Sequence, residues 1–109
     1  MQTQNLTMTT DVYFIKLDQP LSGRWAGDVE NRLQEIARQG GKRVVLNLEN
    51  VPFIDKRGLA TLIAGLQALG NNAANLQLIA PQTQPKLLFE LTGFDQIFHI
   101  IDRPVSIAA

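Results

Sequence analysis

The sequence contains no cysteine and only one histidine among its 109 residues. Disulfides and thiolate metal sites are therefore excluded, and nothing in the composition requires an oxidising compartment. A transition-metal centre or a histidine-dependent nucleophile would also lack most of its usual side chains. We expect no metal and no cofactor, and we expect His99 to have a structural role rather than to act as a base or a ligand.

An excess of either charge is also missing, because ten basic and ten acidic residues cancel. The chain as a whole therefore has neither the basic footprint of a nucleic-acid-binding protein nor a basic membrane-binding patch. No apolar run approaches the roughly 20 residues that span a bilayer. Residues 1–11 lack the basic and apolar regions of a signal peptide. These absences predict a small cytoplasmic domain with no nucleic-acid partner and no membrane insertion.

Motifs for nucleotide binding and for catalysis are missing as well. The Gly40-Gly41 pair has neither the GxGxxG nor the Walker spacing. Asp55 has no second carboxylate near it in the sequence except Glu49, which lies across a turn, so paired-carboxylate chemistry has no support. The sequence therefore predicts a binding protein and not an enzyme.

Strand-like and helix-like segments alternate along the chain. Strand patterns cover residues 12–17, 44–48, 75–80 and 97–101, with a short one at 21–25, and helix patterns cover 27–39, the segment after Asp55 and the segment from Thr83. The alternation predicts an α/β fold in which helices pack against a small, largely parallel sheet. We expect a flexible leader over residues 1–10, one domain over residues 11–103 and a tail over residues 104–109.

The chain is organised around Asp55. Before it, residues 44–48 form an apolar run of the kind found in strands that are covered on both faces. Asp55 stands where a helix should begin, and its carboxylate can accept hydrogen bonds from the free amides of the first turn. Apolar residues then recur at three- and four-residue steps, which predicts an amphipathic helix: Leu59, Leu62, Ile63, Leu66 and Leu69.

Two motifs carry a resemblance to a known family. The run NLENVPFIDKRGLATLIAGL at residues 47–66 resembles the central motif of STAS domains, the family of anti-sigma factor antagonists, whose usual form is DLSGVxFIDSSGLxxLL. The run LLFELTGFDQIFHI at residues 87–100 resembles the family's closing pattern, LLELTGLDxLFxI. The two motifs and the layout around them cover most of the chain from about Tyr13 to Asp102. The resemblance implies a mixed sheet and a bacterial regulator of transcription that works in signal transduction through protein–protein interaction.

The sequence departs from the family at one position. Where regulated members carry a phosphorylatable serine after the aspartate, this chain has Lys56, and the next serine position is Arg57. Asp55, Gly58 and Leu59 are kept. The resemblance therefore implies a protein that binds an anti-sigma factor/serine kinase but has lost the phosphorylation switch.

The expected partner surface is the junction at Asp55 together with the outer face of the following helix, where small side chains would let a partner approach closely. The candidate partner-binding residues are Asp55, Lys56, Arg57, Gly58, Ala60, Thr61 and Ala64. Cations in the first turn of a helix oppose its dipole by a few tenths of a kcal/mol each. Two interpretations of Lys56 and Arg57 follow: they point into water, or they contact an acidic partner or a bound anion.

Two other roles remain open. The chain could be a non-catalytic STAS subunit of a larger assembly, such as a lipid-transport ABC complex or a multi-STAS signalling particle. It could also be a sensor that binds an anion or a nucleotide at Lys56 and Arg57. The partner separates the first role from an antagonist, since an antagonist binds a kinase fold and a subunit binds a transporter or scaffold.

Overall fold

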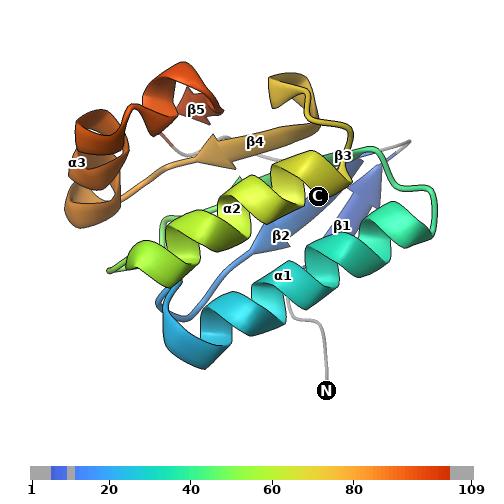
Figure 1. Cartoon of the computed structure of the whole chain (residues 1–109), viewed down its shortest axis with the longest axis horizontal. Coiled ribbons are helices and arrows are strands. Elements are labelled where there is room, and N and C mark those ends of the chain that lie inside the picture. The colour runs from blue at the N-terminus through green and yellow to red at the C-terminus, as the bar shows by residue number, and fades with distance from the viewer. Residues whose placement is uncertain (1–5, 10–11, 104–109) are drawn as a thin grey trace.

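The computed structural model describes residues 6–9 and 12–103. Strands and helices alternate along these residues (Figure 1). The elements are β1 (Leu6–Thr9), β2 (Val12–Lys16), α1 (Gly23–Arg38), β3 (Arg43–Asn47), α2 (Lys56–Ala68), the 3₁₀ helix η1 (Ala73–Asn75), β4 (Leu76–Ile79), α3 (Thr83–Thr92), the 3₁₀ helix η2 (Phe94–Gln96) and β5 (His99–Ile101).

The strands form one mixed sheet in the order β1-β2-β3-β4-β5. β1 pairs with β2 antiparallel, and every other neighbouring pair is parallel. One helix connects each parallel pair, because parallel strands need a crossover that returns the chain to the start of the next strand. The N-terminal ends of α1, α2 and α3 therefore lie towards the carboxyl edge of the sheet. This confirms the predicted class, a small mixed and largely parallel sheet with helices against it.

The core lies between the sheet and the two helices α1 and α2, which lie side by side on one face (Figure 1). In β3, Val44 and Leu46 are fully buried, whereas the alternate residues Val45 and Asn47 are half-buried. Successive side chains of a strand point to opposite faces. The strand that was expected to be covered on both faces is thus fully covered on one.

Small residues of α2 allow α1 to pack closely against it. The hydroxyl of Thr61 donates a hydrogen bond to the backbone carbonyl of Ala26, at 3.1 Å. A Cβ atom on Gly65 would lie 2.5 Å from Cδ1 of Leu33. Part of the helix face with small side chains, which was predicted to bind a partner, therefore forms the contact between α1 and α2.

The N-terminal third differs from the sequence-based expectation in two ways. Four residues of the expected flexible leader form β1, so that prediction is wrong for Leu6–Thr9. The rest of the leader, residues 1–5 and 10, and the predicted tail at 104–109 lie outside the described residues. α1 begins at Gly23 instead of residue 27, and the short strand expected at 21–25 is reduced to a single bridge between Leu21 and Ile54. Trp25 lies within α1, and its side chain is exposed.

The sequence predicts that Leu87, Leu88 and Leu91 form the buried side of the helix after Thr83, but α3 is rotated from that orientation. The buried residues of this helix are Pro85 and Phe89, while Leu87 and Leu91 are 52% and 75% exposed. The sequence also predicts that Gly93 ends this helix, and this is confirmed: Gly93 adopts the left-handed conformation that favours glycine, with φ of 79°. Of the three leucines, Leu88 packs against the core, whereas Leu87 and Leu91 are surface residues.

Candidate functional site

Asp55 lies between the N-terminal ends of two helices. Its Oδ1 accepts a hydrogen bond from the backbone N–H of Gly58 at 2.8 Å, which confirms the predicted cap of α2. Its Oδ2 lies 3.4 Å from the backbone nitrogen of Gly23, the first residue of α1. Ser22, the N-cap residue of α1, makes no capping hydrogen bond with its side chain. One carboxylate therefore serves both helix ends, where free amides and the helix dipole favour negative charge.

Backbone contacts hold this junction together. The N–H of Leu21 donates to the carbonyl of Phe53 at 3.0 Å, and the N–H of Asp55 donates to the carbonyl of Leu21 at 3.4 Å. Gly58 packs directly on this segment, because a Cβ atom there would lie 2.0 Å from the carbonyl oxygen of Leu21. The glycine of the motif is thus required by the close approach of two backbone segments.

Asp55→Ala should lower the free energy of unfolding by about 0.5–2 kcal/mol, because the change removes the acceptor that caps α2. Asp55→Asn is the matched control, since asparagine caps a helix about as well as aspartate. Chemical denaturation of the parent protein and both variants checks this. A midpoint of Asp55→Ala equal to that of the parent would remove Asp55 from the capping role.

The residues predicted to bind a partner do not all reach the surface. The exposed ones are Lys56, Arg57 and Ala60, and the half-buried ones are Asp55 and Ala64. Gly58 is buried, and Thr61 is only 1% exposed. The assignment of these last two residues to the partner surface is wrong, because both are occupied in positioning α2 against its neighbours.

Exposed cations surround the shared helix ends. Neither α1 nor α2 has an acidic residue in its first turn. Arg57 extends towards α1, where a Cβ atom on Gly27 would lie 3.2 Å from its Nη2. Arg24, at the start of α1, has its guanidinium carbon 5.6 Å from the centroid of the Trp25 ring. Together with Lys56 and the positive ends of the helix dipoles, these side chains form a positive surface that can bind acidic groups of a partner.

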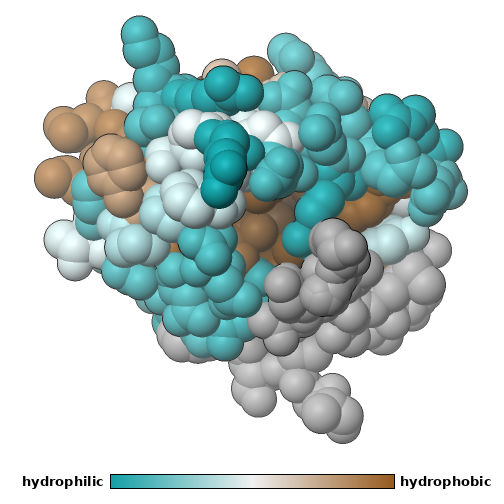
Figure 2. All heavy atoms as spheres, turned by 90° about the horizontal axis from the view of Figure 1, so that it is seen from below, coloured by the Kyte–Doolittle hydropathy of each residue, from teal (hydrophilic) through white to brown (hydrophobic). Residues whose placement is uncertain are grey.

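Exposed apolar side chains that the sequence analysis missed lie just before α2 and on α3. Gln84 of α3 holds the junction with two hydrogen bonds: its Oε1 accepts from the N–H of Ile54 at 2.9 Å, and its Nε2 donates to the carbonyl of Ile54 at 3.1 Å. Phe53, the neighbour of Ile54, is 46% exposed. Leu87 and Leu91 continue along α3, and Figure 2 shows hydrophobic atoms projecting on the side where Figure 1 places this helix. We call the six residues Phe53, Lys56, Arg57, Ala60, Leu87 and Leu91 the docking edge.

The described part of the chain contains no group of three or more acidic or histidine side chains that could hold a metal ion. His99 is exposed in β5, at the end of the sheet. Within residues 6–9 and 12–103, every helix is too short or too polar to cross a lipid bilayer.

Comparison with known proteins gives consistent results. A family model described as the STAS domain matches residues 3–106. The anti-sigma-B factor antagonist of Staphylococcus aureus is 28% identical over 95 residues, which make up 86% of this chain and 88% of that protein. The protein of the same name from Staphylococcus epidermidis is 29% identical over 90 residues, 83% of each chain.

Solved structures share the fold. A protein of Thermotoga maritima described as a candidate anti-sigma factor antagonist has a TM-score of 0.82 at 20% identity, over 89% of this chain and 84% of its own. The anti-sigma factor antagonist SpoIIAA in its unphosphorylated form has a TM-score of 0.74 at 19% identity, over 88% and 85% of the two chains. The phosphorylated form, from Bacillus, has a TM-score of 0.68 at the same identity and covers 88% of each chain. The arrangement of sheet and helices is thus common to all three structures.

Proposed function

Because the chain belongs to the STAS domain family, we propose that it is an anti-sigma factor antagonist without a phosphorylation switch. It binds an anti-sigma factor with serine kinase activity through the docking edge. The observation that carries the proposal is the exposed pair Lys56 and Arg57 at the start of α2, where regulated members of the family have hydroxyl groups. The names of the Staphylococcus relatives support an anti-sigma factor as the partner, and the resemblance to regulated members of the family supplies its kinase activity.

The docking edge combines two features that protein interfaces use. Its cations and the helix ends attract an acidic surface, which speeds association and selects the partner. Its exposed apolar side chains are Phe53, Leu87 and Leu91, and burying them against a partner lowers the free energy of the complex. Ala60 contributes a small exposed side chain on α2, so a partner can approach the backbone of this helix.

The loss of the switch follows from charge and access. A phosphate adds about −1.5 to −2 charges at neutral pH and disrupts an interface that faces acidic groups. SpoIIAA is known in a phosphorylated form, whereas Lys56 cannot accept a phosphate. Thr61, the next hydroxyl of α2, is buried and bonded to the carbonyl of Ala26, so a kinase cannot reach it. The proposed antagonist therefore stays competent to bind in the presence of ATP.

Incubation of the parent protein with its purified anti-sigma kinase and ATP should leave the intact mass unchanged, while a binding isotherm still shows the complex. Lys56→Ser should gain one phosphate under the same conditions and lose binding as it does so. Mass spectrometry and calorimetry on the same samples give both readouts. A phosphate on the parent protein at Ser22, Thr61 or any other residue would contradict the proposed loss of the phosphorylation switch.

Lys56→Glu should weaken binding about tenfold or more, because it places like charges opposite each other in the interface. Lys42→Glu is the matched control: it makes the same change of charge at an exposed residue just before β3, at the opposite edge of the sheet. Isotherms at two salt concentrations check both variants. Equal weakening by the two changes would mean that net charge, and not the docking edge, governs association.

A further inference from the structure

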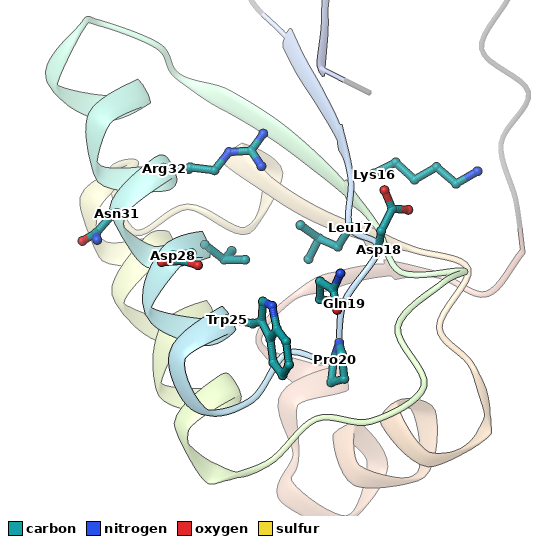
Figure 3. A pocket seen from close by; sticks show the side chains of 10 residues that line it. Lys16, Leu17, Asp18, Gln19, Pro20, Trp25, Asp28, Asn31 and Arg32 are labelled. Carbon is teal, nitrogen blue, oxygen red and sulfur yellow. The ribbon is translucent and has the colours of Figure 1, made fainter. Parts of the chain in front are cut away.

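A pocket separate from the docking edge lies between α1 and the segment that follows β2. It has a volume of about 620 Å³ and is lined by residues 16–20 and by one face of α1 (Figure 3). Pockets for small molecules in proteins typically have volumes of roughly 300–1,000 Å³. The size is therefore that of a small-molecule site, and no residue of the docking edge lines it.

The inner wall of this pocket is apolar. Leu17 and Val29 are buried beneath it, and Pro20 and the exposed ring of Trp25 face each other at one end (Figure 3). Seen from below, apolar surface lies at the bottom of a hollow among hydrophilic side chains (Figure 2). Such a wall suits the hydrocarbon part of a ligand, which gains free energy when it leaves water.

One cation of the pocket has a buried nitrogen that binds no other described residue. The Nη2 atom of Arg32 is buried and has no hydrogen-bond partner in the described part of the chain. Its side chain extends from α1 towards the strand, across the pocket (Figure 3). Burial lowers the pKa of the Arg32 guanidinium from its ordinary value, but the group remains charged at neutral pH. A buried charged donor without an acceptor is unfavourable. When the guanidinium turns towards the pocket, Nη2 becomes accessible and a bound anion supplies the acceptor that it lacks in the free protein.

The other charges of the pocket restrict that anion. Lys16 is paired with Glu49 at 2.9 Å, and Asp18 accepts a hydrogen bond from the side chain of Asn50 at 3.2 Å. Asp28 also lines the pocket, and no ion pair between described residues joins Arg32 to either aspartate. The two carboxylates would repel a multiply charged anion such as phosphate more strongly than an anion with one charge.

We propose that this pocket binds a small organic monocarboxylate, with its carboxylate on Arg32 and its apolar body against Leu17, Pro20 and Trp25. A guanidinium offers two parallel N–H donors that match the two oxygens of a carboxylate. The apolar wall holds the rest of the molecule and distinguishes it from small inorganic anions. This site is independent of the docking edge and of the function proposed for it.

Octanoate and octanamide test the proposal, since they share an alkyl chain and differ in charge. Trp25 is the only tryptophan of the chain, so the intrinsic fluorescence reports directly on the pocket. Octanoate should give a saturable change, and octanamide and inorganic sulfate should bind at least about tenfold more weakly. Backbone amide shifts in NMR spectra should change at residues 16–20 and along α1. Equal binding of octanoate and octanamide, or no saturation below about 10 mM octanoate, would overturn the proposal.

Two arginine variants locate the charge that matters. Arg32→Gln should weaken octanoate binding about tenfold or more and leave octanamide binding unchanged. Arg38→Gln is the matched control, because Arg38 lies on the same helix but is exposed and paired with Glu35. If Arg32→Gln bound octanoate as tightly as the parent, the proposed role of Arg32 would be wrong. The comparison of octanoate with octanamide on the parent protein decides the question even if this variant does not fold.

Discussion

Gly58→Ala is expected to lower the free energy of unfolding by about 3 kcal/mol, at the upper end of the range for overpacked sites. The new Cβ atom would lie 2.0 Å from the carbonyl oxygen of Leu21 and 2.9 Å from Cγ2 of Ile54. The oxygen belongs to backbone that is bonded to Asp55 and bridged to Ile54, so it cannot move without breaking the junction. Urea denaturation of parent and variant measures the loss.

Gly27→Ala is the matched control, since it makes the same change inside the neighbouring helix. There the nearest atom to a Cβ is Nη2 of Arg57 at 3.2 Å, the end of a flexible side chain that can move. Alanine is favoured over glycine in a helix interior by about 0.5–1 kcal/mol, so this variant should be neutral or slightly more stable than the parent. Equal losses in both variants would show that the contact with Leu21 is not the cause.

Leu62→Ala is expected to lower the free energy of unfolding by about 2–5 kcal/mol. The side chain of Leu62 is 0% exposed and belongs to the core between α2 and the sheet. Its truncation loses apolar burial and leaves a cavity that close-packed neighbours fill only in part. Denaturation followed by circular dichroism measures the effect.

Ala60→Ser is the control on the exposed side of the same helix. A small polar side chain at a surface position without partners usually changes stability by less than about 0.5 kcal/mol. If Ala60→Ser and Leu62→Ala had equal effects, α2 would be rotated from the orientation described above, and the composition of the docking edge would change with it.

These variants separate two roles along α2. Gly58, Thr61 and Leu62 hold the helix against its neighbours, whereas Lys56 and Ala60 face outwards. Changes at the inner residues should alter stability, and a folded fraction of such a variant should still bind the partner. Changes at Lys56 should alter binding and leave the denaturation midpoint nearly unchanged.

The sequence alone determined the features that depend on a few neighbouring residues. Asp55 could be assigned as the cap of α2 because the amide that it binds in that helix, the N–H of Gly58, follows it closely in the chain. Gly93 could be assigned as a helix end because glycine tolerates the left-handed conformation. The apolar spacing from Leu59 to Leu69 fixed the length and the inner face of α2, and the alternation of strands and helices fixed the fold class.

Contacts between segments far apart in the chain decided the composition of the docking edge and of the junction at Asp55. The sequence predicted Thr61 on the partner surface, but α1 packs over it in the structure. The start of α1 could not be predicted, because its capping carboxylate, that of Asp55, lies 32 residues away in the chain. On α3, the four-residue spacing of Pro85 and Phe89 was a signal for the buried side, but the leucines gave a competing pattern. Which pattern is buried depends on the surface that a helix meets. Local sequence does not encode that surface, so only the tertiary structure shows the exposed Leu87 and Leu91.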